Sequence, residues 1–150
     1  MKLLKDLGAE HVLNSSEPNF DEDLGKLVRR LNATVCFEAI SGSATSQIMK
    51  VMPSKSITIV YGLLSEQSIS DIDPLLLIGR NQRIEGFFLG HWLSGQSTWF
   101  LLGVMKQASK IISDKTIHSE VAKRISLFEV REAIPEYKKN MTAGKYLIYP

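Results

Sequence analysis

The hydrophobic pattern between residues 34 and 62 changes from a continuous apolar run to a helical stripe and back. Thr34–Ile40 is almost wholly apolar, with β-branched and aromatic side chains, which predicts a strand buried on both faces of a parallel sheet. Ser41-Gly42-Ser43 interrupts this run. Ser56–Tyr61 repeats it and ends at Gly62. Two buried strands with a short helix between them predict a βαβ unit.

The helix of this unit is expected to begin at Ser43, whose hydroxyl is placed to cap it. Ala44, Ile48 and Met52 recur every four residues and predict its buried face. In parallel sheets ligands bind at the carboxyl ends of the strands. We therefore expect a cofactor at Ser41-Gly42 and Tyr61-Gly62.

Towards the amino terminus, the pattern predicts a short helix, a short strand and a longer helix. Lys2–Leu7 is amphipathic, and His11–Asn14 is read as the strand. Asn19 is placed to cap the longer helix, which carries acidic residues in its first turn and arginines in its last.

Beyond Gly62, Asp73-Pro74 predicts the start of a one-turn helix, and Arg83–Leu89 reads as a third core strand. A long helix is expected from Ser94 to about Ser113. From residue 115 the character changes: Ile117–Leu127 alternates loosely. Two further elements follow, a helix with an internal proline, for which a kink or a late start is expected, and a final strand: Glu129–Asn140 with Pro135, and Lys145–Tyr149.

Composition narrows the function classes. The chain has 150 residues, of which 44% are hydrophobic and 23% charged, as in an ordinary globular protein. Its formal charge of +2 is too small and too dispersed to indicate nucleic-acid binding. The amino end does not resemble a signal peptide, and no apolar run is long enough to span a bilayer. We expect a soluble, cytoplasmic protein with no membrane partner.

Candidate chemistry is sparse. Cys36 is the only cysteine and lies in a predicted buried strand, so we interpret it as an inert core thiol. His11, His91 and His118 lack the spacing of metal ligands, and we expect structural or surface roles. Glu38 could be a base, but in a buried strand it is better interpreted as paired or at a strand end. No catalytic or metal-binding residue is predicted.

Five segments match one family in sequence order: LKDLGAEHVLN, TVCFEAISG, ITIVYG, RIEGFFL and NMTAGKYLIYP, at 4–14, 34–42, 57–62, 83–89 and 140–150. With them the chain resembles the carboxyl-terminal, cofactor-binding half of the medium-chain dehydrogenase/reductase superfamily. The closest resemblance is to its zinc-independent NADPH:quinone oxidoreductase and enoyl reductase branch. It implies an α/β fold, a partial Rossmann-type parallel sheet with flanking helices.

The resemblance also implies domains and site residues. Residues 1–115 would be a partial dinucleotide-binding domain, and residues 116–150 a tail that in relatives returns to the catalytic lobe. The cofactor would be NADPH, or NADH, without zinc. The residues expected to contact it are Ser15, Ser41, Gly42, Tyr61, Gly62, Leu63, Phe87, Phe88, Leu89 and Lys145.

The sequence also departs from the family. It shows neither a preceding catalytic lobe nor the glycine fingerprint that presents helix N–H groups to the pyrophosphate, so we expect the first βαβ of the Rossmann fold to be absent.

Two functions follow. The first is the cofactor-binding portion of an NAD(P)H-dependent oxidoreductase, which in the complete enzyme would transfer hydride to a small hydrophobic quinone or activated alkene. The second is a catalytically incomplete fragment that acts as a dimerisation or interaction module. Whether the chain alone is an enzyme stays open here. A homodimer is expected through an edge strand, with Arg83–Leu89 and the segment after it as the candidate.

Overall fold

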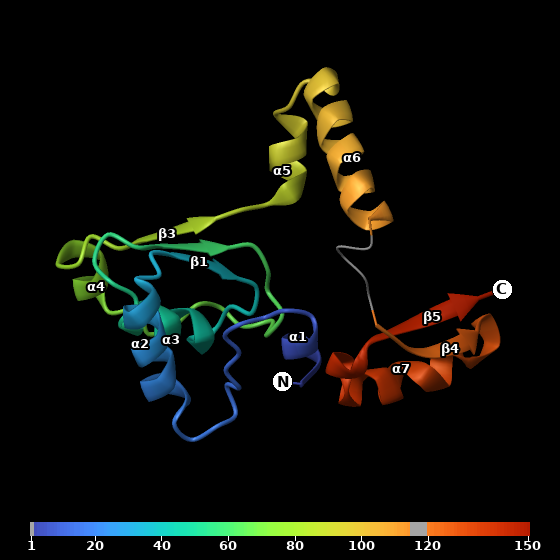
Figure 1. The fold of residues 1–150 in the computed structure, drawn as a ribbon, viewed down its shortest axis with the longest axis horizontal. Coiled ribbons are helices and arrows are strands. Elements are labelled where there is room, and N and C mark those ends of the chain that lie inside the picture. The colour runs from blue at the N-terminus through green and yellow to red at the C-terminus, as the bar shows by residue number, and fades with distance from the viewer. Residues whose placement is uncertain (1, 115–119) are drawn as a thin grey trace. The chain divides into compact units, whose positions relative to one another are not determined.

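The computed structural model describes residues 2–114 and 120–150. The chain forms two compact units, Met1–Ser94 and Gly95–Pro150. Figure 1 shows the elements of each. The domain boundary expected between residues 115 and 116 falls outside the described residues, as does His118, so the domain division stays a prediction.

The amino-terminal unit contains a parallel sheet. Its strands are β1 (Val35–Glu38), β2 (Ile57–Val60) and β3 (Arg83–Gly86), in the order β1-β2-β3. The last residues of the three strands, Glu38, Val60 and Gly86, are in register, so all three strands end at the same edge. This arrangement, with helices beside a parallel sheet, confirms the expected α/β fold with a partial Rossmann-type sheet (Figure 1).

The helices of this unit are α1 (Lys2–Asp6), α2 (Phe20–Leu31), α3 (Ser43–Val51), α4 (Pro74–Ile78) and α5 (Leu89–Ser94). Helices α2 and α3 lie side by side over one face of the sheet (Figure 1). The two helices lie close together at Gly25 of α2, where an added Cβ would make an ordinary van der Waals contact of 3.5 Å with the Val51 side chain. The buried residues of α3 are Thr45, Ser46 and Met49. The predicted stripe of Ala44, Ile48 and Met52 is therefore correct only at Met52, which is buried just after the helix.

Strand β1 is not buried on both faces, which corrects the prediction from its apolar run. Cys36 is half-buried and Glu38 is buried, whereas Val35 and Phe37 are exposed, Phe37 to 71%. Successive side chains of a strand point to opposite faces, and helices α2 and α3 cover the face of Glu38. The run of apolar residues gave no information about which face is covered.

The predicted strand His11–Asn14 is also wrong, because these residues belong to no strand. Val12 and Leu13 are half-buried and line a small cavity together with Leu27 of α2. Their apolar side chains therefore pack on a helix, without the backbone pairing that defines a strand.

Strand β3 and the predicted long helix have different bounds from those expected. The strand ends at Gly86 rather than Leu89. The helix expected from Ser94 begins later, as α6 (Thr98–Ser113), and a separate helix, α5, ends at Ser94. Ser97, not Ser94, is the cap of α6, and its Oγ accepts a hydrogen bond from the Phe100 N–H at 3.3 Å. Ser94 instead closes α5, where its Oγ donates to the His91 carbonyl.

The carboxyl-terminal unit continues with a second βαβ arrangement. Strands β4 (Val121–Ser126) and β5 (Lys145–Tyr149) are parallel, and β5 has its predicted bounds. Between them lie a 3₁₀ turn (Leu127–Glu129), α7 (Val130–Lys139) and a second 3₁₀ turn (Met141–Ala143). Helix α7 runs through Pro135, so the late start is wrong.

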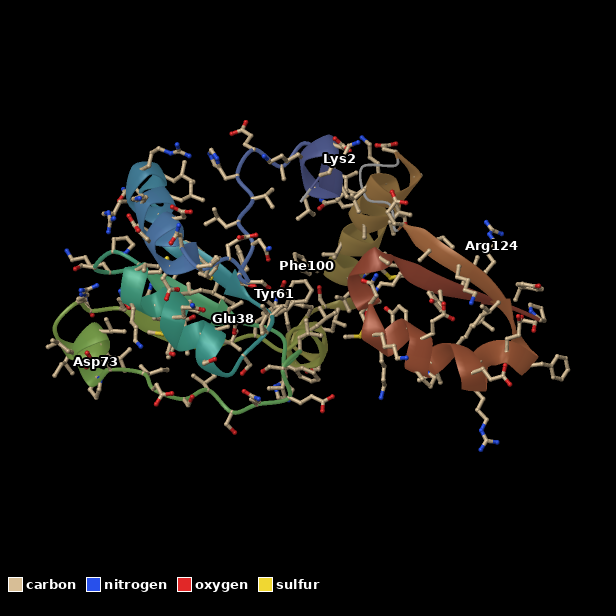
Figure 2. The ribbon with its side chains drawn as sticks, turned by 90° about the horizontal axis from the view of Figure 1, so that it is seen from below. Lys2, Glu38, Tyr61, Asp73, Phe100 and Arg124 are labelled. Atoms are coloured by element: carbon tan, nitrogen blue, oxygen red, sulfur yellow. The ribbon has the colours of Figure 1, made fainter. Side chains whose placement is uncertain are left out.

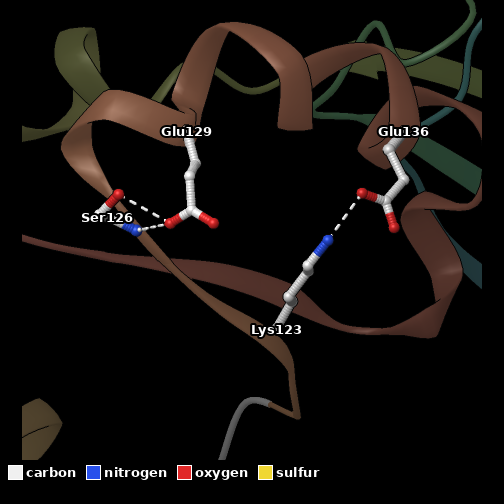
Figure 3. Close-up of polar contacts among 4 residues, drawn as sticks. All are labelled: Lys123, Ser126, Glu129 and Glu136. Carbon is white, nitrogen blue, oxygen red and sulfur yellow. Dashed lines mark hydrogen bonds and ion pairs between the residues drawn. The ribbon is translucent and has the colours of Figure 1, made fainter.

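Hydrogen bonds set the start of this helical segment (Figure 3). The Ser126 N–H donates to Glu129 Oε2 at 2.7 Å as part of a capping box between the two residues. The Ser126 Oγ donates to the same oxygen, also at 2.7 Å. A second contact joins β4 to α7, where Lys123 Nζ donates to Glu136 Oε2 at 2.9 Å.

These bonds also change the pKa values of the two carboxyl groups. The bond from the Ser126 hydroxyl lowers the pKa of Glu129, and bonds from Lys123 and Tyr146 lower the pKa of Glu136. These contacts tie β4 to α7.

No helix among the described residues is long and apolar enough to cross a membrane.

Candidate cofactor site

Two turns meet at the carboxyl edge of the sheet. One follows β1 at residues 39–42, and the other follows β2 at residues 61–65. The Tyr61 N–H donates to the Glu38 carbonyl at 2.9 Å, and the Leu64 N–H donates to the Ala39 carbonyl at 3.1 Å. The Ser65 N–H donates to the Ile40 carbonyl at 2.8 Å. These backbone bonds hold the two turns together as one surface beyond the strand ends.

Gly62 lies where the two turns approach most closely. A Cβ at this position would stand 2.5 Å from the Ala39 carbonyl oxygen and 3.0 Å from its Cα. Real Cβ atoms do not approach backbone so closely, so only glycine fits without a shift of one turn. The glycine that the sequence places at the end of β2 therefore has a packing reason.

Glu38 ends β1, and its carboxylate is buried, with 2% of the residue exposed. Oε1 accepts hydrogen bonds from the Ile40 N–H at 2.6 Å and the Ser41 N–H at 2.8 Å. Oε2 accepts from the Ser41 N–H at 3.0 Å and from the Thr45 hydroxyl at 2.9 Å. A buried carboxylate requires such donors to replace its hydration. The interpretation of Glu38 as a partnered strand-end residue is confirmed.

Ser41 and Gly42 both have a left-handed backbone, with φ of 69° and 67°. The Ser41 Oγ donates to the Gln67 carbonyl at 3.1 Å. A Cβ on Gly42 would meet the side chains of Ser65 and Gln67 at 3.2 Å. Gly42, rather than Ser43, is the cap residue of α3. The first turn is thus packed against the loop that follows the second one.

Apolar and aromatic side chains lie together on the exposed face of the sheet, close to the strand ends. Phe37, Ile59, Tyr61 and Phe87 come from all three strands or their ends and line an apolar cavity of about 450 Å³. Figure 2 labels Tyr61, which is half exposed, near Glu38 at this edge. Leu63, Phe88 and Leu89 are exposed in the segments that follow β2 and β3. The Phe88 ring meets His91 edge-on, with centroids 5.0 Å apart.

The structure brings most of the predicted contact residues to this edge, but not all. Ser15 lies in an exposed turn ahead of α2, which is held by local hydrogen bonds from Asn14 to Glu17 and from Ser16 to Asn14. Lys145 begins β5 in the other unit, where its N–H donates to the Glu120 carbonyl at 2.7 Å.

Two residues of this site were missed from the sequence. Thr45 and Gln67 complete the hydrogen bonding of the first turn, one to Glu38 and the other to Ser41. A signal existed for Thr45: an acidic residue at a buried strand end needs donors, and the start of the next helix supplies them. Gln67 lies in a segment without periodicity, so no signal pointed to it.

Within residues 2–114 and 120–150, no three His, Cys, Asp or Glu side chains are grouped so that they could hold a metal ion. Burial raises the pKa of the Cys36 thiol, and the nearby Glu38 carboxylate raises it further. His11 lies 3.4 Å from an Arg30 nitrogen, away from the strand ends. What this edge offers chemically is backbone groups and apolar rings, which suit the positioning of a flat organic group rather than metal or nucleophilic chemistry.

Residues 1–109 match the family model described as zinc-binding dehydrogenase. Because this match spans most of the chain, the chain belongs to that family. It corresponds to the carboxyl-terminal, cofactor-binding half of the medium-chain dehydrogenase/reductase superfamily, as the sequence indicated. The family description names zinc, but the described side chains offer no group suited to it.

Individual proteins from a plant and from bacteria are similar to this chain. A mitochondrial enoyl-[acyl-carrier-protein] reductase of Arabidopsis thaliana is 26% identical over 109 residues, which is 73% of this chain and 27% of that protein. A candidate NADPH:quinone reductase of Mesorhizobium loti superposes with a TM-score of 0.85 at 30% identity, covering 99% of this chain and 42% of its own. A second candidate NADPH:quinone reductase, from Bacillus thuringiensis, superposes with a TM-score of 0.81 at 18% identity. The superposition covers 99% of this chain and 45% of that protein. The chain therefore spans less than half the length of these proteins.

Proposed function

We propose that this chain binds the nicotinamide dinucleotide of an NAD(P)H-dependent oxidoreductase of the quinone and enoyl reductase type. The observation that carries the proposal is the pair of interlocked turns at the carboxyl edge of a parallel sheet, where such sheets bind ligands. Relatives named as NADPH:quinone reductases and as an enoyl reductase support the choice of cofactor and reaction.

The residues proposed to contact the cofactor surround these turns. Ser41 and Gly42 would border the nicotinamide ribose, and Tyr61, Gly62 and Leu63 would line the dinucleotide. Phe87, Phe88 and Leu89 would reach the nicotinamide ring. For Ser15, at the adenosine end, and for Lys145, the proposed contact rests on the family resemblance alone. NADPH is the preferred cofactor, with NADH as the alternative.

In the complete enzyme the bound cofactor would supply a hydride to a quinone or an activated alkene. This chain would bind and orient the dinucleotide, and its apolar rings would keep water from the ring that reacts. The test is NADPH oxidation by a complete polypeptide that contains this chain, with quinones and with enoyl thioesters as acceptors. Turnover of either acceptor is expected, and the absence of turnover with both would overturn the proposed reaction.

A second candidate, a dimerisation module, is favoured by the edge position of β3. The N–H groups of Arg83 and Phe87 donate to carbonyls of the β2 segment, so by alternation that of Ile84 points away from the sheet. An unpaired strand edge is a template for pairing with another chain. We propose a homodimer formed through this edge.

Light scattering of the purified chain tests the dimer. A dimer mass is expected for the wild type and a monomer mass for Ile84→Pro, which removes the outward N–H but no bond within the sheet. A monomeric wild type would exclude the dimer, and a dimeric Ile84→Pro would place the interface elsewhere.

A further inference from the structure

Glu38 does more than satisfy its own burial, because the groups that it holds belong to the proposed cofactor turn. Its carboxylate accepts four hydrogen bonds from three donors, all within the next seven residues. Two of the donors are the backbone N–H groups of Ile40 and Ser41, and the third is the Thr45 hydroxyl in the first turn of α3. One side chain therefore joins the end of β1, the turn and the start of the helix.

The turn needs such a constraint. Ser41 has a left-handed backbone, an unfavourable conformation for a residue with a side chain. Its N–H is shared between the two carboxylate oxygens at 2.8 Å and 3.0 Å, so the carboxylate fixes the direction of this peptide group.

We infer that Glu38 is a positioning residue, whose buried carboxylate sets the backbone of the Ser41-Gly42 turn at the cofactor edge. The main-chain carbonyl of the same residue accepts the Tyr61 N–H at 2.9 Å and connects this turn to the second one. The effect of Glu38 on cofactor binding rests on the proposed function, whereas its effect on the turn backbone does not.

Two variants probe the carboxylate. Glu38→Gln keeps the size of the side chain but only one of its two oxygens. The Ser41 N–H, which donates to both oxygens of Glu38, then faces an NH₂ donor at one of the two positions. Thr45→Val removes the hydroxyl and leaves both backbone bonds. We expect the backbone of the turn to change more in Glu38→Gln than in Thr45→Val.

Gln82→Ala is the matched control. Gln82 is also buried and polar, but it lies just before β3, at the opposite end of the sheet, where its Nε2 donates to the Met52 and Pro53 carbonyls. Its loss destabilises the same unit without touching the turn. Any effect that Glu38→Gln shares with Gln82→Ala is therefore attributed to the lower stability of the unit and not to the turn.

The first measurement is amide hydrogen exchange with NMR shifts, below the unfolding temperature of each variant. Glu38→Gln is expected to accelerate exchange at Ser41 about tenfold or more and to shift the Ser41 and Gly42 amides. Gln82→Ala should leave these amides unchanged. Unchanged amides in Glu38→Gln would overturn the inference, whether or not the chain binds a cofactor.

The second measurement is NADPH titration of the same variants. Binding about tenfold weaker in Glu38→Gln, with wild-type affinity in Gln82→Ala, is expected. Equal weakening in both variants, or in neither, would overturn the positioning role. If the wild type itself does not bind NADPH, the proposed function of this chain fails, and hydrogen exchange still decides the inference.

Discussion

Gly62 lies so close to Ala39 that a Cβ would stand 2.5 Å from the Ala39 carbonyl oxygen. The two backbones come this close because hydrogen bonds join the turn after β1 to the turn after β2. The relationship makes the second glycine of the proposed site a test of the geometry.

Gly62→Ala is predicted to destabilise the amino-terminal unit by about 2 kcal/mol, because the added methyl overpacks a backbone that cannot withdraw without breaking hydrogen bonds. Urea unfolding measures the change. Gly86→Ala is the matched control, since a Cβ there meets nothing within 4 Å. Equal stability of Gly62→Ala and the wild type would show that the two turns are not in contact as described.

Ser126→Ala is predicted to destabilise the carboxyl-terminal unit by about 1 kcal/mol, because it removes the hydroxyl of the capping box. The measurement is the midpoint of thermal unfolding. Ser113→Ala is a suitable comparison, since that hydroxyl donates to a carbonyl in the last turn of α6 and caps no helix start. A Ser126→Ala midpoint as high as that of Ser113→Ala would contradict the capping role.

Acid is predicted to weaken the contacts between β4 and α7. Glu129 and Glu136 have pKa values lowered by hydrogen bonds, to Ser126 in the first case and to Lys123 and Tyr146 in the second. A carboxyl group whose pKa is lower in the folded state stabilises the fold at any pH above its unfolded pKa, about 4.5. This contribution is lost as the pH falls through the pKa of the folded state. The loss is modest because both groups are exposed.

Urea midpoints at pH 7 and pH 3.5, about a unit below the ordinary glutamate value, measure this loss. Glu136→Gln should reduce the difference between the two midpoints, whereas Glu132→Gln, elsewhere on α7, should leave it as in the wild type. A difference unaffected by Glu136→Gln would show that the Lys123–Glu136 pair does not contribute.

The sequence predicted β1, β2 and β5 well because each is a short, largely apolar run next to a turn residue. β2 and β5 were located to within two residues, and the turns at Ser41-Gly42 and Gly62 lie at the strand ends as expected. Burial was harder to predict. Phe37 is as apolar as a core residue but exposed, because covering one face of a strand depends on helices from elsewhere in the chain.

The errors have local causes. Val12 and Leu13 are only two consecutive apolar residues, too short a run to distinguish a strand from a loop that packs on a helix. The long helix begins at Thr98 rather than after Ser94, because Gly95 lies in the segment between α5 and α6 and favours a break there. The backbone donors to Glu38 could not be identified from the sequence, since the Ile40 and Ser41 N–H groups face the carboxylate only once the turn has formed.

The central claim is that the edge formed by the two turns binds a nicotinamide dinucleotide. Titration of the purified 150-residue chain with NADPH, followed by nicotinamide fluorescence and calorimetry, tests it most directly. We predict saturable binding in the micromolar range, weakened in Gly62→Ala and unchanged in Ser126→Ala. No binding up to millimolar NADPH would contradict the claim for this chain and would favour a role as an interaction module.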